Sequence, residues 1–205
     1  FQYISKIIEQ RQYQSLLEFG SGVSTVRWAL EFPRMSITSI ESDRGFMGET
    51  RRLLNAVAPD NCVDLQHRPL RLKFSRGRPF ITYTTPDLPK AIDIVIVDGP
   101  PAATRRGREA CLYCAYDRLR VGGTVILDDL CRQDEQTILA NWLSVYPDSF
   151  EVSRWDGGHG LAQLTKVTPR KMIWTATTFR DSWVVNGQRA KQILKDKVKQ
   201  HIGKL

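Results

Sequence analysis

Long apolar runs are missing from this sequence of 205 residues, and cysteine is scarce. No run approaches the ~18 consecutive apolar residues of a membrane-spanning helix, so we expect no transmembrane segment. Cys111 and Cys114 form a Cys-x-x-Cys pair, but no second pair follows to complete a zinc site. No disulfide pattern is evident either, so we expect reduced thiols on a packed helix and a cytoplasmic protein. The chain opens on Phe1 rather than Met, which predicts a trimmed N-terminus.

Positive charge is in surplus, +8 for the whole chain, but it is concentrated at one end. Residues 168–205 hold nine Lys or Arg and two acidic residues, whereas residues 1–167 hold 21 basic and 20 acidic residues. The surplus therefore indicates a charged extension, and it weakens the case for a nucleic-acid-binding domain. We predict one domain over residues 1–167 and a basic, helical extension over residues 168–205.

Short apolar segments alternate with helical patterns over the first two thirds of the chain. The predicted strands are Ser15–Phe19, Met35–Glu41, Cys62–Gln66, Ile92–Val97 and Val121–Leu127. The predicted helices between them run through Trp28 and over Gly45–Val57 and Arg105–Leu119. This alternation implies right-handed crossovers and a doubly wound, mostly parallel α/β sheet.

The end of the predicted domain has a different pattern. Phe150–Trp155 and Leu161–Lys166 have the character of strands, and the glycine-rich turn Asp156-Gly-Gly-His-Gly160 joins them. We therefore expect an antiparallel hairpin that brings the sheet to seven strands.

An insertion over residues 68–90 mixes basic and aromatic side chains. Its basic residues are Arg71, Lys73, Arg76 and Arg78, and its aromatic residues are Phe74, Phe80 and Tyr83. Such a mixture binds nucleic acid or a charged sugar in some proteins. The alternative, which we favour, is a solvated β-hairpin whose aromatic residues cover the edge of the sheet.

Two glycines follow the first predicted strand, in Glu18-Phe19-Gly20-Ser21-Gly22-Val23-Ser24-Thr25. They allow a tight turn and a close backbone approach to a ligand just before a helix begins. An NAD fingerprint would need a third glycine where this chain has Thr25. The carboxylate of Glu18 would repel a pyrophosphate, but it suits a cofactor that carries an amino group and a sulfonium.

Glu41 ends the second predicted strand, 19 residues after Gly22. An acidic side chain at this point accepts hydrogen bonds from both hydroxyls of a ribose. The alternative for Glu41 alone is a charge at a helix N-terminus. Because Glu18 and Glu41 end adjacent strands, we favour cofactor binding.

Together with Val97-Asp98-Gly-Pro-Pro and Gly-Gly-Thr-Val-Ile-Leu-Asp128-Asp129, these motifs resemble those of class I S-adenosylmethionine (SAM)-dependent methyltransferases. The similarity covers residues 10–167, and the terminal hairpin is typical of that fold. In the family, the glycine loop holds the methionine part, an acid after the second strand holds the ribose, and a residue after the third strand meets the adenine. The resemblance implies these cofactor-binding residues: Glu18, Phe19, Gly20, Ser21, Gly22, Ser24, Thr25, Glu41, Ser42, His67 and Asp98. The adenine position, usually acidic, is occupied here by Gln66-His67-Arg68.

The residues after the fourth strand argue against methylation of a nucleic-acid base. Asp98-Gly99-Pro100-Pro101 stands where such enzymes have Asn/Asp-Pro-Pro-Tyr, so an aromatic platform for a flipped base is missing. Asp98, Asp128 and Asp129 fall at the carboxyl ends of neighbouring strands, where oxygen ligands suit Mg²⁺. The resemblance to catechol-type and macrolide-sugar O-methyltransferases implies a metal that orients and acidifies an acceptor hydroxyl. The alternative is that Asp98 contacts cofactor or substrate while Asp128 or Asp129 caps the next helix.

Asp98, Asp128 and His159 are the candidate catalytic residues, and His159 is a candidate general base on the same edge of the sheet. A glycine-flanked histidine in an exposed turn is, alternatively, a bystander. Arg105, Arg106 and Arg108 would line the acceptor side and suit a carboxylate or phosphate, or else form a solvated helical turn.

The extension repeats Ala190, Leu194, Val198 and Ile202, with Lys191, Lys195 and Lys199 beside them. A basic amphipathic helix of this kind lies on anionic lipid or packs on a partner. We favour packing against the domain or against a second copy in a homo-oligomer. The sequence as a whole predicts O-methylation of a small or saccharide-like anionic acceptor. The alternatives are an RNA methyltransferase and a SAM-binding subunit without catalysis.

Overall fold

The computed structural model describes all residues except 76, 174, 176, 188–190 and 192–205. Within the described part of the chain, no helix is both long and apolar enough to cross a membrane.

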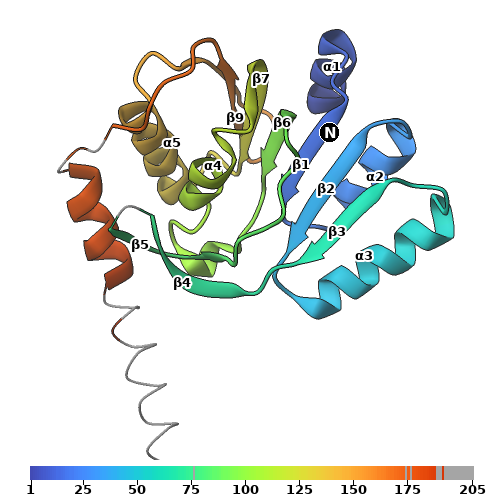
Figure 1. The fold of residues 1–205 in the computed structure, drawn as a ribbon, viewed down its shortest axis with the longest axis horizontal. Helices are drawn as coiled ribbons and strands as arrows, with labels where there is room; N and C mark the ends of the chain where they lie inside the picture. The colour runs from blue at the N-terminus through green and yellow to red at the C-terminus, as the bar shows by residue number, and fades with distance from the viewer. Residues whose placement is uncertain (76, 174, 176, 188–190, 192–205) are drawn as a thin grey trace, which may run out of the picture.

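The core is a seven-stranded sheet in the order β3-β2-β1-β6-β7-β9-β8 (Figure 1). Its strands are β1 (Ser15–Phe19), β2 (Ser36–Glu41), β3 (Val63–His67), β6 (Ile92–Val97), β7 (Leu119–Asp128), β8 (Phe150–Trp155) and β9 (Leu161–Lys166). The first five are parallel, and β9 is antiparallel to both β7 and β8. The predicted doubly wound sheet with an antiparallel hairpin at its end is therefore confirmed.

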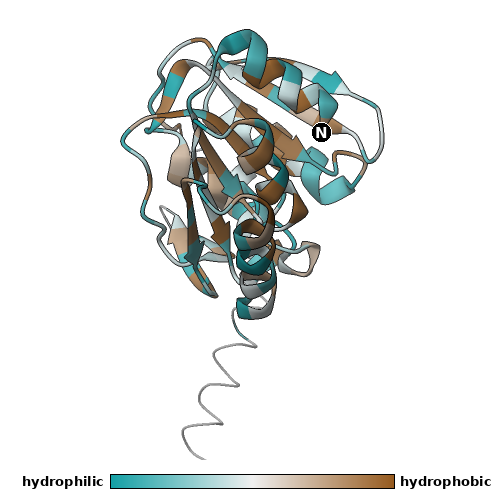
Figure 2. Cartoon of the chain, turned by 90° about the vertical axis from the view of Figure 1, so that its right-hand side faces the viewer, coloured by the Kyte–Doolittle hydropathy of each residue, from teal (hydrophilic) through white to brown (hydrophobic). Residues whose placement is uncertain are grey.

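Helices cover both faces of the sheet (Figure 1). α1 (Gln2–Arg11), α2 (Val23–Glu31) and α3 (Arg44–Val57) lie on one face, whereas α4 (Glu109–Ala115) and α5 (Gln133–Val145) lie on the other. Alternate residues of a strand serve the two faces: Leu16 packs in the core under the first group, and Leu17 packs in the core under the second. Figure 2 shows the apolar strands inside and hydrophilic stretches on the outer helices.

The helix predicted over Arg105–Leu119 is much shorter than expected. A 3-10 turn at Ala102–Thr104 ends at Arg105, whose φ is 61°, and α4 begins only at Glu109. Gly107 packs so closely that a Cβ there would lie 2.3 Å from the Ile81 carbonyl oxygen. The backbone between the two helical segments is therefore fixed by contact with the insertion.

The insertion forms a separate antiparallel hairpin, β4 (Leu70–Ser75) and β5 (Arg78–Tyr83), so the predicted β-hairpin is confirmed, but the expectation that it is solvated is wrong for β5. It stands where a crossover helix between β3 and β6 would be expected. Figure 1 shows it running along the edge at which the parallel strands end. β5 is buried along its whole length, whereas β4 is partly exposed.

Helical residues 177–187 of the extension pack against this hairpin. The Ser182 hydroxyl donates to the Pro79 carbonyl at 2.9 Å, and the Trp183 indole N–H donates to the Gly77 carbonyl at 3.0 Å. The predicted apolar positions Ala190, Leu194, Val198 and Ile202 lie outside the described residues.

Candidate functional site

The glycine loop after β1 packs directly against the end of β6. Gly20 has a φ of 100°, and a Cβ there would lie 3.1 Å from the Gly99 nitrogen and 3.2 Å from the Asp98 carbonyl carbon. The Gly20 N–H donates to the Ile40 carbonyl at 2.9 Å. Glycine at this position therefore brings the ends of β1, β2 and β6 together.

Glu18 was expected to contact a ligand, but it is completely buried beneath the loop. Its carboxylate accepts hydrogen bonds from Thr25, from Ser39 at 2.9 Å and from Trp28 at 3.2 Å. Burial raises the pKa of Glu18, and these hydrogen bonds oppose that rise. Thr25 is also buried, and its hydroxyl accepts from the Gly22 N–H at 3.1 Å. The side chains of Glu18 and Thr25 are therefore not exposed at the surface of the loop, and they support the loop from within.

Glu41, at the end of β2, ties the glycine loop to the start of α3. One carboxylate oxygen accepts from the Ser21 N–H at 3.1 Å. The other accepts from the N–H groups of Ser42 and Asp43, at 2.6 and 2.8 Å. An ionised carboxylate that accepts several backbone N–H groups is held in one orientation.

A cavity of about 620 Å³ opens between these loops and the hairpin. This volume is in the range of small-molecule and cofactor sites. Five residues predicted for the cofactor line it: Gly20, Ser21, Glu41, Ser42 and Asp98. Eight further residues line it that the sequence did not single out for this purpose: Asp43, Phe46, Pro69, Leu70, Arg71, Tyr83, Gly99 and Pro101.

Three other predicted cofactor residues are not part of the lining of this cavity. Phe19 lines a neighbouring cavity under the hairpin, and Ser24 lies in the first turn of α2 behind the loop. His67 ends β3, and its Nε2 lies 3.1 Å from the Ser42 carbonyl oxygen. His67 therefore contacts the segment that lines the cavity rather than lining it itself.

Asp98 faces the cavity from the end of β6, with its side chain 47% exposed. Desolvation by the surrounding protein raises the pKa of Asp98 to about 6. Arg108 opposes the rise, whereas the charges of Asp128, Asp129 and Glu18 add to it. Asp98 is thus a carboxylate that is mostly ionised at neutral pH and still basic enough to accept a proton.

A family model described as a methyltransferase domain matches residues 17–130, which is more than half of the chain. The chain belongs to the methyltransferase-domain family. The family predicted from the sequence motifs is therefore confirmed. No curated protein sequence matches the chain.

Solved methyltransferase structures share the fold at low sequence identity. A Podospora anserina methyltransferase bound to S-adenosylhomocysteine (SAH) is 14% identical, with a TM-score of 0.63, over 81% of this chain and 77% of that chain. The Streptomyces achromogenes O-methyltransferase TomG, in complex with SAM, is 16% identical, with a TM-score of 0.61; the match covers 81% of this chain and 78% of that chain. A Bacillus cereus O-methyltransferase in complex with SAH is 12% identical, with a TM-score of 0.61; the match covers 80% of this chain and 79% of that chain. At these identities the likeness shows the fold.

The three aspartates predicted to bind a metal are not arranged to do so in this methyltransferase. Asp129 accepts from Arg108 at 3.0 Å and pairs with Arg132 at 2.7 Å. Asp128 accepts from the Asp129 N–H at 2.8 Å. Over the described residues, His, Cys, Asp and Glu form no group of three or more that could hold a metal ion. The predicted Asp98, Asp128 and Asp129 site therefore does not fit Mg²⁺ in this arrangement.

Each arginine predicted to line the acceptor side pairs with an acidic residue of the chain: two of them inside the protein and one at its surface. Arg106 is buried, and its Nε donates to Glu109 at 2.9 Å. Arg105 pairs at the surface with Asp134 at 3.0 Å. The buried Arg108 donates to the backbone carbonyl of Asp98 at 2.7 Å as well as to Asp129. Arg106 and Arg108 are therefore held by acidic partners inside the protein, whereas a contact between Arg105 and an acceptor stays a prediction.

His159 also lies away from the 620 Å³ cavity, whose lining does not include it. Its backbone carbonyl accepts from the Cys131 N–H at 2.9 Å, and its exposed side chain lines a separate hollow with Cys131 and Arg154. The structure does not bring His159 to Asp98, so it does not support His159 as the general base.

Arg108→Met is expected to destabilise the methyltransferase domain by about 3–5 kcal/mol, because it leaves buried carboxylates and carbonyls without their donor. For a chain of this size, that loss lowers the Tm by about 10 °C. Thermal unfolding measures the effect. Arg105→Met is the matched control, since the Arg105 side chain is 58% exposed and should change stability by less than about 1 kcal/mol. Equal Tm values for the two variants would contradict the internal role of Arg108.

Proposed function

We propose that this methyltransferase transfers the methyl group of SAM to a hydroxyl of a small anionic acceptor. The observation that carries the cofactor assignment is the Glu41 carboxylate, fixed at the wall of a cavity that also contains the glycine loop and Asp98. Asp43, Glu41 and Asp98 outnumber the one basic residue of the lining, so the cavity has a net negative charge, which suits a sulfonium and an amino group. Phe46 and Leu70 supply an apolar wall for a planar base.

Asp98 is the residue of this chain that would receive the proton of the acceptor hydroxyl. When bound, SAM supplies a methyl group on a sulfonium, which reacts by in-line displacement, so positioning of the acceptor oxygen matters most. Two contacts fix the backbone at Asp98. Arg108 donates a hydrogen bond to the Asp98 backbone carbonyl, and the adjacent Gly99 packs on the glycine loop. Its elevated pKa near 6 brings it closer to the value of an effective base at neutral pH.

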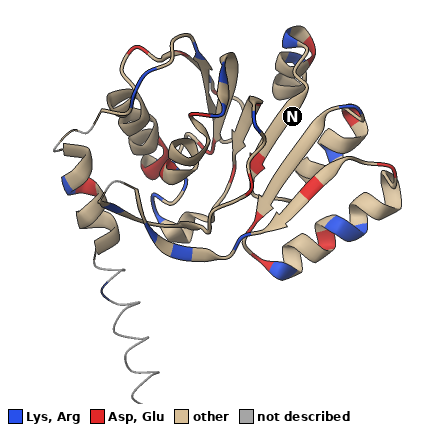
Figure 3. Ribbon diagram, viewed as in Figure 1, with Lys and Arg blue, Asp and Glu red and all other residues tan. Residues whose placement is uncertain are grey.

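Two cations of the hairpin lie nearer the cavities than the buried Arg106 and Arg108, and we assign the anionic group of the acceptor to them. Arg71 lines the cofactor cavity, and Lys73 lines the neighbouring one. Figure 3 shows positive charge along β4 at this edge of the sheet. Neither cation has an acidic partner within ion-pairing distance among the residues that the structure describes, so both are available to an anionic group.

All four cysteines are free, which supports a cytoplasmic location.

Transfer of labelled methyl from SAM to 4-hydroxybenzoate and to glucose 6-phosphate tests the proposal. We expect product from at least one of them and expect EDTA to change its rate by less than about 2-fold, because Asp129 is committed to two arginines. Loss of turnover in EDTA and its recovery with Mg²⁺ would contradict the expectation that methyl transfer by this protein does not require a metal. SAH binding without any methylated hydroxyl would favour the non-catalytic alternative.

A further inference from the structure

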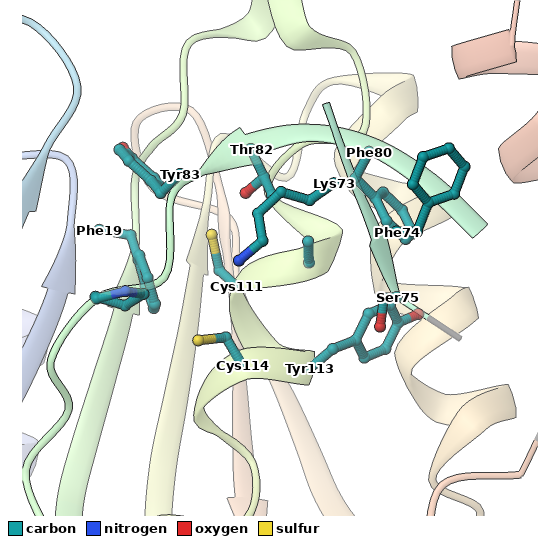
Figure 4. Close-up of a pocket in the computed structure, with 12 residues that line it drawn as sticks. Phe19, Lys73, Phe74, Ser75, Phe80, Thr82, Tyr83, Cys111, Tyr113 and Cys114 are labelled. Atoms are coloured by element: carbon teal, nitrogen blue, oxygen red, sulfur yellow. The ribbon is translucent and has the colours of Figure 1, made fainter. Parts of the chain in front are cut away.

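A second cavity, of about 190 Å³, lies between the hairpin and α4 (Figure 4). Tyr83 lines both this cavity and the cofactor cavity, and is the residue that they share. We infer that the second cavity binds a single aromatic ring with an anionic substituent, as part of the acceptor. This inference rests on the proposed function.

The volume of the cavity fits one ring. An apolar protein cavity of about 150 Å³ is enough to bind benzene. The 190 Å³ here therefore holds a six-membered ring with a small substituent, and it is too small for a nucleoside or a disaccharide.

The walls of the cavity are aromatic on several sides. Phe19 comes from the end of β1, Phe80 from β5 and Tyr113 from α4, and the ring centroids of Phe80 and Tyr113 are 6.0 Å apart. Figure 4 shows these side chains surrounding the space beneath the hairpin. Aromatic walls from separate elements favour a planar apolar ligand, because ring pairs gain from offset and edge contacts beyond simple burial.

Among the described residues that line the second cavity, Lys73 is the charged one. Its ammonium group donates to the Thr85 hydroxyl at 2.6 Å, and Figure 4 shows it pointing into the cavity above Cys111 and Cys114. Burial raises the pKa of both thiols, so they stay neutral and leave the charge of Lys73 uncompensated. A positive charge over an apolar floor selects a ring that carries a carboxylate or another anion.

Tyr83 forms the boundary between the two cavities. A Cβ at Gly99 would lie 2.2 Å from the Tyr83 hydroxyl oxygen, so this hydroxyl rests against the backbone beside Asp98. Burial raises the pKa of Tyr83 well above its ordinary value, which keeps it protonated and able to donate a hydrogen bond. Tyr83 therefore lies between a ring in the second cavity and the cavity that Asp98 lines.

The test is calorimetry or ligand-observed NMR on the protein saturated with SAH, with 4-hydroxybenzoate and with its neutral analogue 4-methylphenol as probes. We expect 4-hydroxybenzoate to bind together with SAH and more tightly than 4-methylphenol. Lys73→Met should weaken 4-hydroxybenzoate about 10-fold or more and remove its advantage over 4-methylphenol. The control Lys90→Met, which alters an exposed lysine outside both cavities, should have no effect.

Ala110→Leu fills the cavity from α4 and should abolish binding of both rings while the Kd for SAH stays the same. SAH binding reports that this variant is folded, and it separates failure of the ring site from failure of the cofactor site. The inference is overturned if neither ring binds, if binding survives Ala110→Leu, or if the ring and SAH compete.

Discussion

Asp98→Asn is expected to lower kcat for methyl transfer by about 10²–10³-fold while the Kd for SAH changes only a few-fold. The substitution keeps the shape of the side chain and the bond from Arg108 to the backbone carbonyl, and it removes the group that accepts the proton. Steady-state kinetics together with SAH calorimetry separate the two effects. Asp87→Asn is the matched control, because the Asp87 side chain is 91% exposed and pairs only at the surface with Arg68.

The pH dependence of Asp98 gives an independent signature in activity and in stability. Activity of the unmodified chain should rise as pH increases through about 6, where Asp98 ionises, and Asp98→Asn should lack this rise. Because the folded pKa is raised from 3.8, the unfolded state holds fewer protons between these two values, and stability falls as pH rises through them. Asp98→Asn should therefore gain thermal stability relative to the unmodified chain above pH 6, and this relative gain should disappear below pH 4. A flat activity profile between pH 5 and 7 would contradict the role of Asp98.

Glu41→Gln is expected to raise the Kd for SAH by about 100-fold or more. The carboxylate accepts from Ser21 on one side and from Ser42 and Asp43 on the other, and an amide cannot accept at both ends. The variant also loses a charged acceptor for ribose hydroxyls, and hydrogen bonds to charged groups contribute about 1.5–3 kcal/mol each. Calorimetry with SAH measures the loss. Glu49→Gln, at an exposed position of α3, is the control, and a Kd within about 3-fold of the unmodified chain for Glu41→Gln would show that Glu41 does not hold the cofactor.

Much of the fold was predictable because the signals were local. Continuous β-branched runs such as Ile92–Val97 predict strands covered on both faces, and all six residues of that strand are buried. The glycine-rich turn before Leu161 predicts the antiparallel end of the sheet, as observed. Positions at strand ends also predicted the cavity residues Gly20, Ser21, Glu41 and Asp98, because parallel strands bring their carboxyl ends together.

The errors arose where side-chain direction or a distant partner decided the outcome. Glu18 stands only one residue before the end of β1, so its side chain still points into the layer between the sheet and α2. The partners of Arg108 include Asp129 and Glu135, which lie more than 20 residues away in the sequence. A local sequence pattern therefore could not predict these ion pairs. A helical pattern over residues 105–119 likewise hid the positive φ of Arg105.

The contribution of the hairpin to the site was also hidden from the sequence. Arg71 and Tyr83 reach the cofactor cavity only because β4 and β5 run along the carboxyl edge of the sheet. The sequence suggested a hairpin there, but its docking depends on contacts with α4 and with residues 177–187. Such long-range packing follows from the three-dimensional arrangement and not from spacing along the chain.

The most direct test of the account is a calorimetric titration of the unmodified protein with SAH and, separately, with NAD⁺. The negative cavity walls and the two-glycine loop predict saturable binding of one SAH per chain and no measurable heat with NAD⁺. Absence of heat with SAH and tight binding of NAD⁺ would contradict the assignment of the cavity to a sulfonium cofactor.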